Sequence, residues 1–119
     1  MNHSKDVGKY GEDTAKKYLL NKGYIFITRN FKSNHREIDL IFKNKKQTVF
    51  IEVKTRLLTR ESETEVPLSC FQTKTLKLAI IDYSIKNKIN LEDIRLDLIL
   101  ILINPKKRLS HLTHYINIF

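Results

Sequence analysis

Hydrophobic and polar residues alternate in two neighbouring stretches of the chain, residues 37–42 and 49–54. Alternation with a period of two residues is typical of a β-strand with one buried face. The residues between the two stretches are polar and lysine-rich, so the pattern predicts a β-hairpin. The apolar face of this hairpin would point into the core. It would consist of Ile38, Leu40, Phe42, Val49, Ile51 and Val53.

The opposite face of the predicted hairpin carries four charged residues, Glu37, Asp39, Glu52 and Lys54. If the turn is a two-residue loop at residues 45–46, Asp39 lies directly opposite Glu52, with their Cβ atoms roughly 5 Å apart. Two carboxylates at that separation repel each other unless a cation or a proton lies between them. A hard divalent ion with oxygen ligands is the natural third partner.

Two helices are predicted from apolar residues at helical spacing. The first covers residues 4–22 and ends at Gly23, and the second begins with a capping box and covers residues 69–86. Gly8 and Gly11 lie inside the first helix, where each costs about 1 kcal/mol relative to alanine. We therefore expect this helix to approach the sheet or a ligand closely at both glycines.

Three more strands and two loops complete the predicted order of elements. Strands are expected over residues 24–29, 95–104 and 111–118, the second central in the sheet and the third at an edge. Residues 30–34 form a predicted loop, and residues 55–67 a longer, exposed and mobile one beside the candidate site. The order of helix, three strands, helix and two strands favours an α/β fold in which helices pack on a mixed five-stranded sheet.

The bulk composition indicates one domain spanning residues 1–119, with 22 basic against 13 acidic residues and a formal net charge of +9. This charge favours a polyanionic partner, although abundant lysine also serves simply to solvate a surface. Cys70 is the single cysteine, which excludes an internal disulfide and suits a reducing compartment. There is no apolar signal segment, and the apolar run 96–103 is too short to span a bilayer, so we expect a cytoplasmic protein without membrane contact.

The charged face of the hairpin suits phosphodiester hydrolysis. Asp39 and Glu52 are the candidate ligands of a Mg²⁺ or Mn²⁺ ion, with the backbone carbonyl of Val53 as a third oxygen ligand. Such an ion acidifies water and stabilises charge on a phosphate. Lys54 lies on the same strand face as Glu52, where its ammonium group reaches the attacking water or a phosphate oxygen.

Further candidate residues lie outside the carboxylate pair. Glu12 has small neighbours on its helix face, so it could approach the site and hold a water molecule next to the metal or a second ion. Glu37 is expected in an outer shell of the site. Five basic residues are candidates for contacts to the nucleic-acid backbone: Lys32, Arg36, Arg56, Lys74 and Lys77.

An aspartate followed by Glu-x-Lys is a weak pattern on its own. The residues Asp39, Glu52 and Lys54 could equally form a cross-strand ion network on a solvated face of the sheet. Their shared face and the basic balance of the chain keep both interpretations open.

A set of short motifs spread over nearly the whole chain is far more specific. It consists of Gly11-Glu12, Ala15, Tyr18-Leu19, Gly23-Tyr24, Arg29-Asn30, Glu37-Ile38-Asp39-Leu40-Ile41, Phe50-Ile51-Glu52-Val53-Lys54, Arg56, Lys74, Arg95-Leu96-Asp97 and the C-terminal segment from His114 to Phe119. Together these motifs resemble the YraN-type family of small bacterial proteins, which is related to the PD-(D/E)xK, restriction-endonuclease-like nucleases.

The resemblance implies a restriction-endonuclease-like α/β/α core and a metal site at Asp39, Glu52 and Lys54, with Glu12 contributed by the first helix. Similar folds include Holliday-junction resolvases, which are homodimers, so a homodimer is compatible with the resemblance. The chain departs from the family pattern at Arg36, where glycine is usual. An arginine there removes backbone freedom and adds a cation that either reaches a phosphate or narrows access to the site.

Two functions follow as hypotheses. The first is a nuclease dependent on Mg²⁺ or Mn²⁺ that hydrolyses phosphodiester bonds of DNA, including branched or processed DNA. The alternative is a catalytically silent nucleic-acid-binding module that keeps the nuclease-like fold. The family resemblance implies the fold directly, whereas the function must rest on the chemistry of the site.

Overall fold

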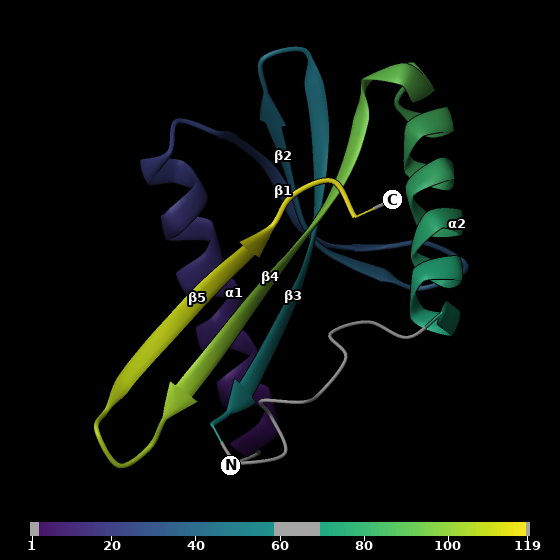
Figure 1. Ribbon diagram of the computed structural model, residues 1–119. Helices are drawn as coiled ribbons and strands as arrows, with labels where there is room; N and C mark the ends of the chain where they lie inside the picture. Colours follow the sequence, from purple (N-terminus) through teal and green to yellow (C-terminus); the bar gives the residue numbers. More distant parts are fainter. Residues whose placement is uncertain (1–2, 59–69, 119) are drawn as a thin grey trace.

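The computed structural model describes residues 3–58 and 70–118. Five strands form one mixed sheet in their chain order, and the two long helices lie on opposite faces of it (Figure 1). The elements are α1 (His3–Asn21), β1 (Ile25–Lys32), β2 (Glu37–Asn44), β3 (Gln47–Leu57), α2 (Cys70–Lys86), the short 3₁₀ helix η1 (Leu91–Asp93), β4 (Ile94–Asn104) and β5 (Leu109–Tyr115). This arrangement confirms the predicted α/β class and the predicted order of helices and strands.

The sheet is antiparallel except at its centre, where β3 and β4 run parallel. A parallel pair needs a crossover connection, which α2 provides between these two strands. The strand β4 therefore lies inside the sheet and β5 forms one of its edges, as the apolar density of residues 95–104 and the alternation of residues 111–118 predict.

The β2–β3 hairpin has the predicted two-residue turn. Asn44 pairs with Gln47, and Lys45, the first turn residue, has a φ of 57°. A left-handed residue at this position is typical of tight hairpin turns, whose twist matches that of the strands. The register of the hairpin follows from this turn and places Leu40 opposite Ile51.

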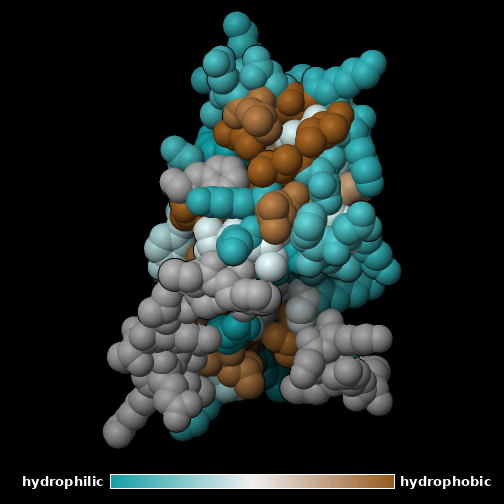
Figure 2. Space-filling view, turned by 90° about the vertical axis from the view of Figure 1, so that its right-hand side faces the viewer, coloured by the Kyte–Doolittle hydropathy of each residue, from teal (hydrophilic) through white to brown (hydrophobic). Residues whose placement is uncertain are grey.

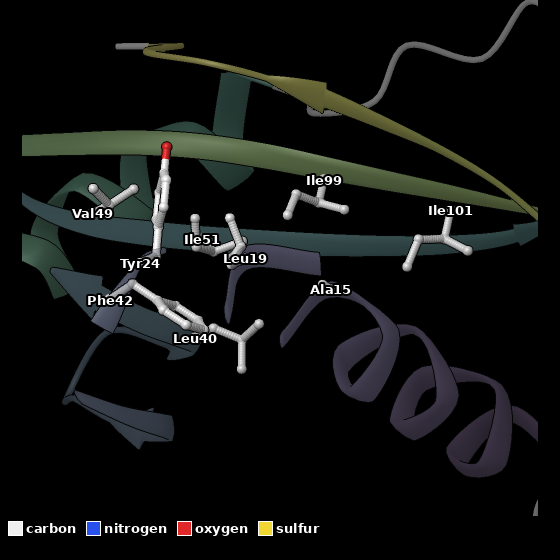
Figure 3. Packing of buried hydrophobic residues seen from close by; sticks show 9 residues of the cluster. All are labelled: Ala15, Leu19, Tyr24, Leu40, Phe42, Val49, Ile51, Ile99 and Ile101. Carbon is white, nitrogen blue, oxygen red and sulfur yellow. The ribbon is translucent and has the colours of Figure 1, made fainter. Parts of the chain in front are cut away.

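Hydrophobic residues are buried on both faces of the sheet, whereas the alternation pattern predicts only one. On the α1 side, a cluster of buried residues gathers between the helix and β2, β3 and β4 (Figure 3). Its members are Ala15, Leu19, Tyr24, Leu40, Phe42, Val49, Ile51, Ile99 and Ile101. The Tyr24 hydroxyl points toward β4.

The second cluster lies under α2 and corrects the prediction for the hairpin. Ile41 and Phe50, which stand between the expected core positions, are fully buried there because α2 covers that face. Ile38 also belongs to this cluster and not to that of Leu40. The alternation therefore predicts the residues that face α1 correctly in the middle of the hairpin, but it places Ile38 on the wrong face.

The strand bounds differ from those predicted, most of all for β1 and β3. The last strand covers Leu109–Tyr115, so the predicted range of 111–118 is wrong at both ends. β1 continues to Lys32, and β3 continues to Leu57, so the loops expected to begin at residues 30 and 55 are wrong at their starts. The cause in β3 is tertiary, because Thr55, Arg56 and Leu57 pair with residues 101–103 of β4. The remainder of the longer predicted loop and the cap at Ser69 lie outside the described residues.

The two glycines inside α1 differ in their surroundings. A Cβ atom added to Gly11 would lie 1.8 Å from the Oγ1 atom of Thr55, so the helix touches β3 at this glycine. A Cβ atom at Gly8 would meet nothing within 4 Å, so the predicted close approach is right for Gly11 and wrong for Gly8. Gly23 has a φ of +91° and follows the end of the helix.

The outer face of α2 mixes exposed lysines with exposed apolar residues. Figure 2 views the molecule from this side and shows hydrophobic residues gathered in one area surrounded by hydrophilic ones. The exposed apolar side chains of α2 are Leu78, Ile81 and Ile85, and its exposed lysines include Lys74, Lys77 and Lys86. Among the described residues, no helix is both long and apolar enough to cross a membrane.

Candidate metal site

A cleft of about 580 Å³ lies between α1 and the carboxyl-terminal half of β3. Four of the predicted site residues line it together. These residues are Glu12, Asp39, Glu52 and Lys54, and the cleft also contains Val53, Arg36 and Arg56.

Asp39 and Glu52 face each other across the hairpin. The ladder between β2 and β3 is regular up to the pair of Leu40 and Ile51, and Asp39 and Glu52 are the next residue on each strand. Their side chains are joined by a hydrogen bond, which brings the two carboxyl groups together. Beyond that pair the side chain of Asp39 replaces a ladder contact, since its Oδ2 atom accepts a hydrogen bond of 2.8 Å from the Val53 N–H. The N–H and C=O of one strand residue point to the same neighbouring strand. The Val53 carbonyl is therefore also turned toward β2 and Asp39.

The proximity of the two carboxyl groups changes the acidity of Asp39. Burial raises the pKa of Asp39 to about 8, together with its hydrogen bond to Glu52 and the negative charge of that residue. The hydrogen bond from Val53 and the charge of Arg36 oppose the increase. Glu52 itself is only 3% exposed. At neutral pH Asp39 therefore keeps its proton unless a cation is bound beside it.

Arg36 provides the cation nearest to Glu52. Its Nη2 atom lies 2.5 Å from the Glu52 Oε2 atom. The Ser33 hydroxyl donates to the Arg36 carbonyl oxygen at 2.8 Å and accepts from the Arg36 N–H at 3.1 Å, which fixes the main chain of the β1–β2 loop. Arg36 is thus part of the site.

Glu12 enters the cleft from α1 and is held by β1. Arg29 donates one hydrogen bond of 2.9 Å to Glu12 and another of 2.8 Å to Asp13. Burial raises the pKa of Glu12, the hydrogen bond from Arg29 lowers it, and the nearby charges of Asp39 and Glu37 raise it further, with a net increase. Glu12 therefore lies within electrostatic reach of the carboxylate pair.

Asn30 connects Glu12 to Glu37, the candidate for an outer shell. With its amide nitrogen turned toward the two carboxylates, Asn30 donates to Glu12 Oε1 at 3.1 Å and to Glu37 Oε1 at 2.9 Å. Glu37 and Glu12 also line a second depression next to the main cleft. The motifs include Arg29 and Asn30 but assign them no role, because only the pairing of β1 with β2 brings them to α1.

Lys54 lies one strand period beyond Glu52 and lines the same cleft. No described carboxylate lies within ion-pair distance of its ammonium group, in contrast to Arg36 beside Glu52. The Lys54 side chain is therefore oriented into the cleft without being neutralised by these acidic groups.

The five basic residues expected to contact nucleic acid are not gathered in one place. Arg36 and Arg56 line the cleft, and Lys32 is exposed at the end of β1. Lys74 and Lys77 are exposed on α2, which covers the other face of the sheet. Only the two arginines therefore share the cleft with the carboxylates.

The donor set fits a hard divalent ion of the magnesium type. No group of three or more His, Cys, Asp or Glu side chains in the described part of the chain forms a ready-made metal cage. Mg²⁺ is usually held by only one or two protein carboxylates, with water and substrate phosphates completing its shell. Asp39, Glu52 and the Val53 carbonyl supply such a partial set.

A second buried carboxylate lies elsewhere in the sheet and has a complete set of partners. Asp97 of β4 is fully buried and receives two hydrogen bonds of 2.9 Å from Arg95, one of 2.7 Å shared with His114 Nε2, and one of 2.9 Å from the Asn117 N–H. Arg95 in turn donates to the Tyr24 hydroxyl at 2.7 Å. Burial raises the pKa of Asp97, but the hydrogen bonds outweigh it and the net pKa is lowered.

A family model described as "Uncharacterised protein family UPF0102" matches residues 11–101, a range that includes the whole carboxylate and lysine constellation. The chain belongs to this family. It is the YraN-type family that the sequence motifs indicate.

Members of UPF0102 match along the full length of the chain. A UPF0102 protein of Syntrophomonas wolfei subsp. wolfei is 34% identical over 116 residues, which cover 98% of this chain and 99% of the relative. A UPF0102 protein of Caldanaerobacter subterraneus subsp. tengcongensis is 36% identical over 119 residues, covering 98% and 97% of the two chains. A UPF0102 protein of Clostridium botulinum is 53% identical over 53 residues, which cover 44% of this chain and 43% of the relative.

Proposed function

We propose that this member of UPF0102 is a nuclease that depends on Mg²⁺ or Mn²⁺ and hydrolyses phosphodiester bonds of DNA. The observation that carries the proposal is the meeting of Asp39, Glu52 and Lys54 in one cleft, with the carboxyl groups of Asp39 and Glu52 hydrogen-bonded to each other. Two acidic groups and an ammonium group at this spacing provide what metal-assisted phosphate hydrolysis needs.

The two carboxylates and one main-chain oxygen would hold the cation. Asp39, Glu52 and Val53 all line the cleft, and the Val53 N–H donates to Asp39 Oδ2, which supports this set of ligands. A bound Mg²⁺ or Mn²⁺ supplies a Lewis acid for the phosphate and lowers the pKa of water. Because the pKa of Asp39 is raised to about 8, this carboxyl group would have to release its proton in order to hold the cation near neutral pH.

Lys54 and Glu12 act beside the carboxylate pair. The Lys54 ammonium group is a compact point charge that positions the attacking water or stabilises a phosphate oxygen. Glu12, held by Arg29, accepts a hydrogen bond from water on the α1 side of the cleft and keeps that water oriented.

The charge of the chain supports a polyanionic substrate. The formal net charge is +9, and Arg36 and Arg56 lie in the cleft where the phosphate would bind. Lys32, Lys74 and Lys77 are exposed and would contact the backbone farther from the site. Affinity supplied by such contacts falls steeply as the salt concentration rises.

A cleavage screen tests the proposal. Single-stranded, duplex, flap and four-way-junction DNA are incubated with the protein and Mg²⁺ or Mn²⁺. We expect cleavage by the wild type, loss of cleavage in Asp39→Ala, Glu52→Gln and Lys54→Gln, and DNA binding that is largely retained. Glu92→Gln removes an exposed acidic side chain of η1 and serves as the matched control for Glu52→Gln. Full cleavage by the Asp39→Ala, Glu52→Ala protein would falsify the proposal.

The ion pair between Arg36 and Glu52 favours a second candidate function, a nucleic-acid-binding module without turnover. In such a module the guanidinium would neutralise Glu52 permanently. A calorimetric titration with Mn²⁺ separates the two functions. Mn²⁺ binding that is lost in Asp39→Asn supports the nuclease, whereas DNA binding without any metal binding supports the module.

A further inference from the structure

Arg36 and the proposed metal ion require the same carboxylate. The Arg36 Nη2 atom lies 2.5 Å from Glu52 Oε2, within charge-assisted hydrogen-bonding distance. The Glu52 side chain is 3% exposed, so its other neighbours are protein groups, above all Asp39. The guanidinium is therefore the positive partner of a carboxylate that would otherwise be buried beside another acidic group.

The Ser33 hydroxyl fixes the main chain of Arg36, while the Arg36 side chain borders the open cleft. Ser33 bonds both the N–H and the carbonyl oxygen of Arg36, and its hydroxyl also accepts from the His35 N–H at 3.1 Å. The Arg36 side chain is 23% exposed and lines the open cleft. The guanidinium group therefore lies next to Glu52 on one side and borders the open cleft on the other.

A cation bound by Asp39 and Glu52 would lie beside the Arg36 guanidinium. Like charges at such separations repel, and the repulsion is stronger in a partly buried cleft than in water. Each positive group therefore weakens the binding of the other to Glu52. A guanidinium released from Glu52 presents several N–H donors in a planar fork that matches the geometry of a phosphate.

We propose that Arg36 and the divalent cation compete for Glu52, and that metal binding transfers the guanidinium from Glu52 to a phosphate of the nucleic acid. The inference rests on the proposed metal site and adds a coupling between the two ligands. Binding of metal strengthens binding of phosphate through Arg36, and binding of phosphate strengthens binding of metal by the same factor.

Isothermal titration of Mn²⁺ tests the competition without any measurement of cleavage. In the absence of DNA we expect Arg36→Gln to bind Mn²⁺ about tenfold more tightly than the wild type, within the usual range of coupling between sites. Arg56→Gln is the matched control, because it removes the same charge from the same cleft but not from the contact with Glu52. We expect its effect to be less than about threefold.

Two further variants separate the direct contact between Arg36 and Glu52 from the overall positive charge of the cleft. Arg36→Lys keeps the charge but loses the planar fork, so its Mn²⁺ affinity should lie between those of the wild type and Arg36→Gln. In a Glu52→Gln background, Arg36→Gln should no longer tighten Mn²⁺ binding, because the carboxylate for which the two cations compete is gone. Circular dichroism melting curves verify that each variant is folded.

The phosphate half of the proposal is tested by DNA binding in a Lys54→Gln background, which removes the proposed cleavage step. Fluorescence anisotropy measures the affinity for a short duplex DNA with and without Mn²⁺. We expect Mn²⁺ to raise this affinity about tenfold when Arg36 is present and about twofold or less in Arg36→Gln. Equal gains in both proteins would show that the guanidinium does not move to the phosphate.

The outcomes distinguish this inference from the proposed function. If the wild type and Arg36→Gln bind Mn²⁺ with equal affinity, or Arg36→Gln binds it more weakly, the competition is wrong while the metal site stands. If neither protein binds Mn²⁺, with or without DNA, both the metal site and the competition are wrong. An equal tightening by Arg36→Gln and Arg56→Gln assigns the effect to net charge and also overturns the competition.

Discussion

Asp97 on β4 and Asp39 on β2 are two acidic residues of one sheet whose pKa values shift in opposite directions. Burial raises the pKa of both, although Asp97 has no exposed surface and Asp39 is partly exposed. Asp97 nevertheless ends with a lowered pKa because Arg95, His114 and the Asn117 N–H all bond to it. Asp39 has one main-chain donor and an acidic neighbour, and its pKa rises to about 8.

The comparison separates a carboxylate with a complete set of partners from one that is a candidate for function. The partners of Asp97 come from β4 and from the C-terminal end of the chain, so the cluster joins these segments and leaves little capacity for a ligand. At Asp39 a second carboxyl group, that of Glu52, lies close by, and repulsion between the two ionised groups would destabilise the protein. A cation bound beside them would remove this repulsion. A strongly raised acidic pKa in a cleft is a typical sign of a functional site.

The largest predicted effect comes from breaking the satisfied cluster. Asp97→Ala leaves the Arg95 guanidinium, whose side chain is 11% exposed, without its charged partner. Removal of one member of a buried ion pair costs about 3–5 kcal/mol of unfolding free energy. Urea denaturation measures this loss, with Glu92→Gln as the exposed acidic control. A loss below about 1 kcal/mol would contradict the structural role of Asp97.

Addition of metal should stabilise the protein through Asp39, the other aspartate of the comparison. At a Mn²⁺ concentration a hundred times its dissociation constant, we expect the wild type to gain about 2.7 kcal/mol of stability. Asp39→Asn and Glu52→Gln should gain almost nothing, because each loses one charged ligand. Thermal unfolding with Mn²⁺ and then with EDTA measures the gain and its reversal. A similar gain in Asp39→Asn would place the ion elsewhere on the protein.

The pH dependence of stability should differ in sign between the two aspartates. The pKa of Asp39 is raised in the folded protein from an ordinary value of 3.8 to about 8. Its contribution is therefore fully present below pH 3.8 and is lost as the pH rises through about 8. Asp97 has a lowered pKa, so its contribution is present at neutral pH and is lost on acidification.

Asp39→Asn isolates the pH-dependent contribution of Asp39 to stability, since the amide keeps the shape of the carboxyl group without its charge. In EDTA we expect the variant to be more stable than the wild type by about 1–3 kcal/mol at pH 9, after allowance for solvent screening in the cleft. The difference should shrink toward pH 5, where Asp39 is protonated in the folded protein. Urea denaturation at both pH values measures it, and a difference independent of pH would contradict the raised pKa.

The sequence predicts the carboxylate pair better than it predicts the contacts around that pair. The two-residue turn and the alternation of the hairpin are local features of the sequence. They are sufficient to predict that Asp39 and Glu52 lie close together, even when the rest of the fold is unknown. The contact of Arg29 with Glu12 requires the packing of α1 on β1, and the contact of His114 with Asp97 requires the β4–β5 pairing. Such tertiary placements leave no periodic signal.

The burial of the second sheet face was missed for a related reason. Ile41 and Phe50 stand between the alternating core positions, and a position becomes core only when a helix covers it. The sequence predicts α2 correctly, but its periodicity does not state which residues of the hairpin lie beneath that helix. Similarly, Thr55 and Leu57 form a strand because β4 pairs with them, although their polar and charged surroundings suggest a loop.

The smallest predicted effect concerns the two glycines of α1, which form a natural matched pair. Gly8→Ala adds a methyl group in open space, so the gain in helix propensity should stabilise the protein by up to about 1 kcal/mol. Gly11→Ala drives the same methyl group against Thr55, and the overpacking penalty of about 1–3 kcal/mol should outweigh that gain. Thermal and urea unfolding of both variants measure the difference.

Gly11→Ala should change the rate of DNA cleavage more than it changes the stability of the protein. Gly11 precedes Glu12, so a helix pushed away from β3 carries Glu12 away from Asp39, and the negative charge of Asp39 then raises the pKa of Glu12 less. We therefore expect Gly11→Ala to lower DNA cleavage, measured under conditions in which the variant is still folded. If Gly8→Ala and Gly11→Ala cleave DNA equally well, the close contact of α1 with β3 does not position the site.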